Sequence, residues 1–205
     1  MRGARRAAGP LVGVVLAAGR SARMGGPKAL ARLDGEPFVA RVARTLCEGG
    51  CGRVVLVLAE PHGARVRAAA PGAAAVWNDR PERGQLSSLK LGLRAAAAHG
   101  CAGAVVALLD HPRVAAETVA ALVAEHRVSG ALLVRPVHAG RGGHPYVIDA
   151  RAFDAVWGAD DGAGARPVLR ALTPARVVEV SDPAIHEDLD TPEDVRAAGG
   201  RPPDR

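Results

Sequence analysis

The stretch that decides the fold is Leu11-Val-Gly-Val-Val-Leu-Ala-Ala-Gly-Arg-Ser-Ala-Arg-Met-Gly-Gly-Pro-Lys28. It begins as an apolar run, 11–18, that is typical of a buried strand, and it continues as a loop rich in glycine and positive charge. In open α/β sheets, ligands bind just beyond the carboxyl ends of the strands. Glycines bring backbone N–H groups close to an anion, and cationic side chains balance its charge; the loop carries Gly19, Gly25, Gly26, Arg20, Arg23 and Lys28. This combination predicts a polyphosphate site.

Two better-known phosphate loops do not fit this stretch. A nucleotide-hydrolase P-loop places Lys directly after Gly and then Ser or Thr, whereas Pro27 precedes Lys28 here and Ala29 follows it. A dinucleotide fingerprint has the spacing G-x-G-x-x-G, which the segment from Gly19 to Gly25 lacks. A solvated surface loop is the remaining alternative. Against it, three cations and three glycines directly follow a strand. Separately, Lys28 is one of only two lysines among 27 basic residues, which suggests that a compact ammonium is needed at this position.

Apolar runs alternate with amphipathic stretches along the chain, a pattern that predicts an α/β protein with a parallel sheet and helices on both faces. Strands are expected at 11–18, 53–59, 74–77, 103–109, 130–135 and 176–180. Helices are expected at 37–48, 61–69, 86–99, 114–127, 150–157 and 165–172, with a short last helix after 191. The two ends, 1–10 and 198–205, are expected to be disordered tails, the first of them basic.

The bulk composition excludes several classes of function. Much of the formal net charge of +6 lies in the two ends, and aromatic residues make up only 2% of the chain, too few for a base-stacking surface, so we expect no nucleic-acid partner. Three cysteines form no disulfide framework and indicate a reducing compartment. No apolar run reaches 18 residues, so we expect a cytoplasmic protein without a membrane partner.

Carboxylates that could hold a divalent metal occur in two places. Asp110 ends the apolar run from Val105 and is followed by His111 and Pro112, which places it at the same sheet edge as the glycine loop. The alternative is that Asp110 caps the next helix, and His111 is interpreted as a second-layer neighbour of a metal. Asp188 and Asp190 are two residues apart, so both side chains of an extended segment would point to one side. Asp190 or Thr191 could equally cap the last helix.

Two further segments carry polar groups suited to substrate binding. Ser87 and Ser88 stand at an expected helix start, where hydroxyls and N–H groups would contact a base or a phosphate; plain helix capping is equally compatible. The glycine-rich segment 140–145 contains His144 and would contact an acceptor, with a general base as a weaker interpretation of that histidine.

The order of these motifs resembles the MobA-like nucleotidyltransferases, most closely their molybdenum cofactor cytidylyltransferase branch. The resemblance covers residues 11–197 and rests on six segments in sequence order: 16–28, 84–89, 110–112, 143–145, 161–166 and 188–194. It implies a Rossmann-like three-layer α/β/α fold with a mostly parallel sheet. The pair Ala17-Ala18, in place of two glycines, resembles members that use pyrimidine nucleotides, whereas His111 is unusual in the molybdopterin branch.

The resemblance also implies an activity and a set of roles. A nucleoside monophosphate, CMP from CTP in our interpretation, would pass to the phosphate of an acceptor such as molybdopterin, with Mg²⁺ as cofactor and pyrophosphate as product. Another acceptor, GTP as donor, or a silent nucleotide-binding homologue are the alternatives. A transient molybdoenzyme or chaperone partner is also implied. The expected catalytic residues are Arg23, Lys28 and Asp110; nucleotide-binding residues Leu16, Ala17, Ala18, Gly19, Arg20, Ser21, Gly25, Ser87 and Ser88; metal ligands Asp110, Asp188 and Asp190; and acceptor-binding residues His144 and Arg166.

Overall fold

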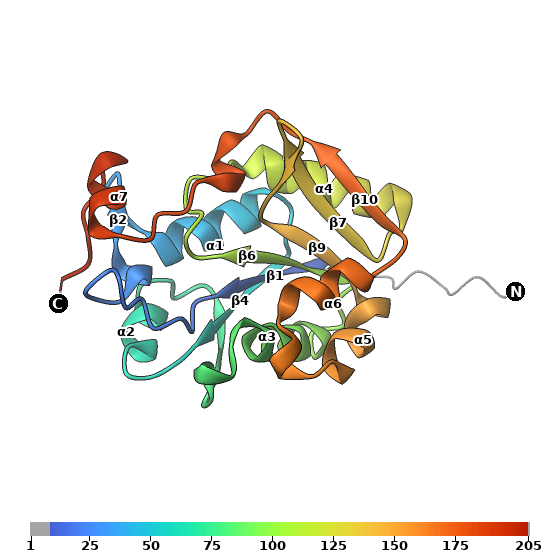
Figure 1. Cartoon of the computed structure of the whole chain (residues 1–205), viewed down its shortest axis with the longest axis horizontal. Helices are drawn as coiled ribbons and strands as arrows, with labels where there is room; N and C mark the ends of the chain where they lie inside the picture. Colours follow the sequence, from blue (N-terminus) through green and yellow to red (C-terminus); the bar gives the residue numbers. More distant parts are fainter. Residues whose placement is uncertain (1–8, 205) are drawn as a thin grey trace, which may run out of the picture.

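The computed structural model describes residues 9–204 and shows one large sheet with helices on both faces (Figure 1). The sheet has the strand order β10-β7-β9-β6-β1-β4-β5. The strands are β1 (Leu11–Leu16), β4 (Arg53–Leu58), β5 (Ala74–Trp77), β6 (Gly103–Leu108), β7 (Leu133–His138), β9 (Tyr146–Asp149) and β10 (Ala175–Glu179), with β8 (Arg141–Gly142) beside β7. All six expected strands are present. The pairs β1–β4, β1–β6, β4–β5 and β7–β10 are parallel, so the expected mostly parallel sheet is confirmed.

The strand β9 is absent from the sequence-based prediction. It runs antiparallel to both β6 and β7 and joins the two parallel parts of the sheet. All four of its residues are buried. A buried run of four residues between a glycine-rich loop and a helix shows no alternation of polar and apolar residues, and periodicity therefore does not reveal it.

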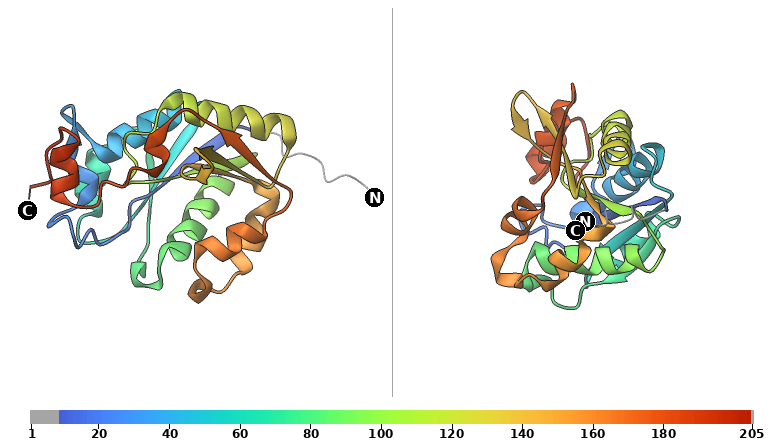
Figure 2. Two further views of the ribbon diagram at one scale, coloured as in Figure 1. Left: turned by 45° about the horizontal axis from the view of Figure 1, so that its top comes forward. Right: turned by 90° about the vertical axis from the view of Figure 1, so that its right-hand side faces the viewer.

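The helices form two layers. They are α1 (Phe38–Glu48), α2 (Gly63–Ala68), α3 (Gln85–Ala97), α4 (Ala116–Ser129), α5 (Phe153–Gly158), α6 (Ala165–Ala171) and α7 (Pro192–Ala197). In the end-on view of Figure 2, α1 and α4 cover one face of the sheet, and α3, α5 and α6 cover the other. Successive residues of β4 point to opposite faces, so Leu56 packs with the α1 layer and Val57 with the α3 layer. The three-layer α/β/α architecture is confirmed.

Close packing fixes α3 against β1. A β-carbon at Gly92 of α3 would lie 2.4 Å from Cγ1 of Val14, so no larger residue fits without moving the helix. This contact holds the first turn of α3 near the carboxyl end of β1. The helix start is therefore positioned to contribute to the same ligand site as the glycine loop.

A buried ionic group fastens α4 to β9. Asp149, which is 1% exposed, contacts Nε2 of His126 at 2.9 Å and Nε of Arg151 at 2.7 Å. Burial alone would raise the pKa of Asp149, but hydrogen bonds from His126 and Arg151 outweigh it and hold this pKa far below its usual range. The carboxylate is therefore charged in the folded protein and ties α4 to the middle of the sheet.

Only one of the two expected tails lies largely within the described residues. Residues 1–8 lie outside the described part of the chain. At the other end, where a tail was expected from 198, Arg201 exchanges two backbone hydrogen bonds of 2.8 Å with Arg32. Within residues 9–204, no helix has the length and apolar character that a membrane crossing requires.

Candidate active site

A cavity of about 430 Å³ opens where the carboxyl ends of β1 and β6 meet the start of α3. Its position agrees with the ligand-binding edge of open α/β sheets. Cationic side chains line it beside carboxylates. The lining residues are Leu16, Ala17, Ala18, Gly19, Ser21, Ala22, Arg23, Lys28, Pro81, Gly84, Gln85, Ser88, Leu108, Leu109, Asp110 and Asp190.

The loop after β1 is held by a few local contacts. Ser21 has a φ of +49°, in the left-handed region, and its carbonyl accepts a 2.9 Å hydrogen bond from the N–H of Met24. The Ser21 hydroxyl accepts a bond of 3.2 Å from the N–H of Lys28. Met24 is 3% exposed and anchors the loop in the core. The turn thereby directs Arg23 and Lys28 toward the cavity.

Both of these cations meet Asp190. Nη2 of Arg23 lies 2.6 Å from Oδ2 of Asp190, and Lys28 donates to Oδ1 of the same carboxylate. The hydrogen bond from Lys28 and the charges of Lys28 and Arg23 outweigh partial burial and hold the pKa of Asp190 below its usual range. Asp190 is free to make these contacts because Thr191, and not Asp190, caps α7 in a capping box with Asp194.

A second carboxylate group lies beside this ion pair. Asp110, His111 and Asp188 each offer one ligand atom, and these three atoms lie within 4.8 Å of one another. Oδ1 of Asp110 is buried and has no hydrogen-bond partner. The N–H of Leu189 donates to the carbonyl of Asp110 at 2.9 Å, and this bond brings Asp188 to the end of β6. A charged oxygen without a partner is the condition that a divalent cation relieves, so these residues fit a metal site.

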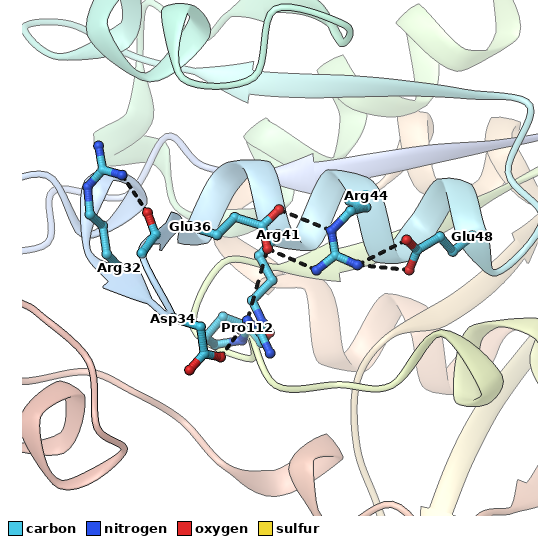
Figure 3. Close-up of polar contacts among 8 residues, drawn as sticks. Arg32, Asp34, Glu36, Arg41, Arg44, Glu48 and Pro112 are labelled. Carbon is cyan, nitrogen blue, oxygen red and sulfur yellow. Dashed lines mark hydrogen bonds and ion pairs between the residues drawn. The ribbon is translucent and has the colours of Figure 1, made fainter.

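The turn that carries Asp110 is held from α1. Figure 3 shows Arg41, whose Nε donates to the carbonyl of Pro112 at 3.0 Å, beside Arg44, which bridges Glu36 and Glu48. The sequence-based alternative that Asp110 caps α4 is wrong. That helix begins at Ala116, and the carboxylate of Asp182 accepts hydrogen bonds from the N–H of Ala115 and the hydroxyl of Thr118. The carboxylate of Asp110 therefore has no capping task.

Ser87 and Ser88 lie differently although they are neighbours. The Nδ2 of buried Asn78 donates to both hydroxyls, at 3.0 and 2.9 Å. Ser87 also donates to the carbonyl of Gly84 and lines a separate cavity, whereas Ser88 borders the main one. Of the two serines, Ser88 is therefore the one placed to meet a ligand in the main cavity. Asn78 fixes the orientation of both serines.

His144, in the neighbouring loop, packs against Asp110, His111 and Asp188, the candidate metal-binding group. Its ring stacks on His111 with centroids 5.2 Å apart and an interplanar angle of 28°. Burial and the nearby His111 lower the pKa of His144 to about 4, so its imidazole is neutral near pH 7. The preceding residue must be glycine, because a β-carbon at Gly143 would lie 2.3 Å from the carbonyl oxygen of Ile185. The close approach of Gly143 to Ile185 fixes the position of the segment that leads to Asp188.

Six of the expected site residues do not line the main cavity: Arg20, Gly25, Ser87, Asp188, His144 and Arg166. Arg20 and Gly25 belong to the β1 loop but are exposed outside the lining, and Arg166 is exposed on α6. The expected roles of Arg20, Gly25 and Arg166 therefore depend on a substrate that extends beyond the cavity.

The amino-acid sequence matches the model of a known protein family. The model of the MobA-like NTP transferase domain matches residues 13–177. The chain belongs to the MobA-like NTP transferase family. A probable molybdenum cofactor guanylyltransferase of Rhodopirellula baltica is 33% identical over 129 residues, which are 61% of this chain and 60% of that protein. The chain is thus a nucleotidyltransferase of the MobA-like type.

Other relatives of this MobA-like protein carry different descriptions. Nicotine blue oxidoreductase of Paenarthrobacter nicotinovorans is 38% identical over 192 residues, covering 89% of this chain and 93% of that protein. The crystal structure of Rv0371c from Mycobacterium tuberculosis is 27% identical, with a TM-score of 0.79 over 93% of this chain and 97% of that one. A manganese complex of Rv0371c is 25% identical, with a TM-score of 0.72 over 92% and 97% of the two chains.

Sequence reasoning missed several residues of this MobA-like site. Asn78 received no role from the sequence, although an Asn at a strand end before a Ser-Ser pair is a usable signal. Lys90, the second lysine, binds Asp161 at 2.7 Å and so ties α3 to the segment before α6. Asp182 caps a helix some 64 to 67 residues away, and no local pattern reveals such a contact.

Proposed function

We propose that this protein transfers CMP from CTP onto the phosphate of an acceptor, with molybdopterin or the molybdenum cofactor as that acceptor. An acceptor phosphate oxygen would attack the α-phosphorus, the bond from that phosphorus to the bridging oxygen would break, and pyrophosphate would leave with the electron pair. The observation that carries the proposal is the cavity in which Arg23 and Lys28 face Asp110 and Asp190. A site that only holds a nucleotide has no need of both kinds of charge.

Each side of the cavity has a proposed task for the nucleotide. Backbone groups of Leu16 to Ser21, with Arg20 and Gly25 of the same loop, would surround the triphosphate. Arg23 and Lys28 would leave Asp190 and neutralise the departing pyrophosphate. Ser88, oriented by Asn78 and with Ser87 behind it, would contact the base. The methyl groups of Ala17 and Ala18 reduce the space for a base, which supports cytosine over guanine.

A divalent cation, Mg²⁺ in the sequence-based expectation, is part of this proposal. Asp110 and Asp188 would hold it, because Asp110 has a buried oxygen without a partner and both residues belong to the metal-binding group. Asp190 is the second choice, since its carboxylate is occupied by Lys28 and Arg23. The ion would offset negative charge between the two phosphates. The manganese complex of Rv0371c supports a divalent ion in such a protein.

The acceptor needs no strong general base. A phosphate monoester is already anionic near neutral pH, so positioning and charge balance would supply the rate. His144, neutral near pH 7, would contact the acceptor from the loop side, and Arg166 would meet its outer part. The three free cysteines support action in the reducing cytoplasm, where a molybdoenzyme or its chaperone would receive the product.

Nucleotide binding tests this proposal before any acceptor is prepared. We expect CTP with Mg²⁺ to raise the thermal midpoint more than GTP, ATP or UTP does, and more than CTP without metal. NADPH serves as the control, because one relative is called an oxidoreductase. A shift with GTP above that with CTP would move the donor to GTP. A shift with NADPH alone would refute nucleotidyl transfer as the proposed reaction.

A further inference from the structure

The group of Asp110, His111 and Asp188 offers a ring nitrogen as well as two carboxylates. Nε2 of His111 lies 3.0 Å from Oδ1 of Asp188 and 3.8 Å from Oδ1 of Asp110. The sequence alone places this histidine behind the metal, as a neighbour of a ligand. In the structure its ring nitrogen instead stands between the two acids. An ion bound between the two carboxylates could therefore also reach this nitrogen.

The two carboxylates lack a fixed positive charge. Within residues 9–204, no lysine or arginine forms an ion pair with Asp110 or Asp188, although Asp190 nearby attracts both Arg23 and Lys28. Two acids that share one imidazole retain excess negative charge, and one of their oxygens is buried without a partner. A bound cation would supply the missing charge.

Packing holds the ring of His111 in place. It is 7% exposed and stacks on His144, so its ring has little freedom to turn. The Nδ1 of His111 is buried with no partner, and its named contacts are those of Nε2 with the acids. The ring is therefore fixed by packing, with its acid-facing nitrogen directed into the group.

We propose that His111 is the third metal ligand, and that the site consequently selects a first-row transition-metal ion over Mg²⁺. The inference rests on the proposed metal dependence and specifies which ion serves it. Mg²⁺ strongly prefers oxygen ligands and near-ideal octahedral geometry, whereas imidazole suits the first-row transition ions. Mn²⁺ binds most weakly in that series, so a preference for Mn²⁺ over Mg²⁺ is a stringent criterion.

Pulsed electron paramagnetic resonance of bound Mn²⁺ tests the ligand directly, without substrate or turnover. We expect the unmodified protein to show ¹⁴N coupling from a directly bound imidazole, and titration to give affinity for Mn²⁺ at least about tenfold above that for Mg²⁺. In His111→Asn the coupling should vanish. The affinity for Mn²⁺ divided by the affinity for Mg²⁺ should fall to a value between about 1 and 3. The asparagine can still hydrogen-bond to Asp188, so a purely structural role would leave the ratio unchanged.

His186→Ala provides the matched control. This histidine lies on the adjacent segment, where its Nε2 contacts the carbonyl of Arg141 and not the acids. It should keep both the coupling and the affinity ratio. Bound Mn²⁺ without ¹⁴N coupling in the unmodified protein would overturn the assignment of His111, whatever the outcome with CTP. Equal affinities for Mn²⁺ and Mg²⁺ would overturn the proposed selectivity. If CTP does not bind but the coupling is present, the proposed reaction fails and the ligand assignment stands.

Discussion

The ion pairs of Asp190 with Arg23 and Lys28, the two cations proposed to bind phosphate, lead to a prediction about nucleotide affinity. In the structure Asp190 forms ion pairs with Arg23 and Lys28, the side chains that the CTP triphosphate would need. Without a metal, the triphosphate must displace this carboxylate before it can bind. Asp190→Asn removes the competing charge and retains the size of the side chain. We therefore expect the variant to bind metal-free CTP more tightly.

The size of the effect follows from the exposure of the two pairs. Lys28 is 12% exposed and Asp190 23%, so this pair stands near the upper end of the range for surface pairs, at about 1 kcal/mol. Arg23 is 71% exposed, and its pair is worth about 0.3 kcal/mol. Together they correspond to a roughly eight- to tenfold gain in affinity for the triphosphate.

Isothermal titration of CTP in the presence of EDTA measures this gain. The difference between the variant and the unmodified protein should shrink at high salt, because both pairs are partly exposed. Glu193→Gln removes the same charge from an exposed residue of α7 that contacts only Arg196 among the described ion pairs, and it should change the affinity less than twofold. Equal or weaker binding by Asp190→Asn would refute the idea that this carboxylate competes with the triphosphate.

Three further predictions concern other parts of the site and its support. Asp110→Asn should lower turnover about 100- to 1,000-fold while metal-free CTP affinity stays within about twofold, which steady-state kinetics and titration would check; unchanged turnover would exclude Asp110 from the metal site. Asn78→Ala removes hydrogen bonds to Ser87 and Ser88 and should cost about 1–3 kcal/mol of unfolding free energy, with weaker CTP binding, as denaturation and titration would show; an unchanged protein would contradict its orienting role. Asp149→Ala should cost about 3–5 kcal/mol. Because folding lowers the pKa of Asp149, the stabilisation from its carboxylate is complete above about pH 4, the pKa in the unfolded chain, and declines below that pH. Denaturation at pH 7 and at pH 3 should therefore show that the variant loses less unfolding free energy between these pH values than the unmodified protein does.

The sequence predicted the parts of the fold that depend on long local patterns. The apolar run from Leu11 and the run ending at Leu108 are six-residue buried strands, and buried strands of this length stand out from their neighbours. Because parallel strands end at one edge, the meeting of the β1 loop with Asp110 also follows from the sequence. The assigned roles of these residues stay predictions.

What could not be predicted depends on contacts between distant segments. The two acids Asp188 and Asp190 look alike in sequence, but the Leu189 N–H bond to Asp110 turns one toward His111, whereas the other meets Lys28. The position of His111 between acids requires the same contact. The antiparallel strand β9 is set by pairing with β6 and β7, and its own four residues carry no pattern.

Release of pyrophosphate from CTP in the presence of molybdopterin tests the central claim most directly. The proposed reaction predicts one pyrophosphate for each cytidylylated acceptor, dependence on a divalent ion, slower release from GTP, and loss of the activity in Asp110→Asn. No pyrophosphate from CTP in the presence of acceptor and metal, or equal release by Asp110→Asn, would contradict it.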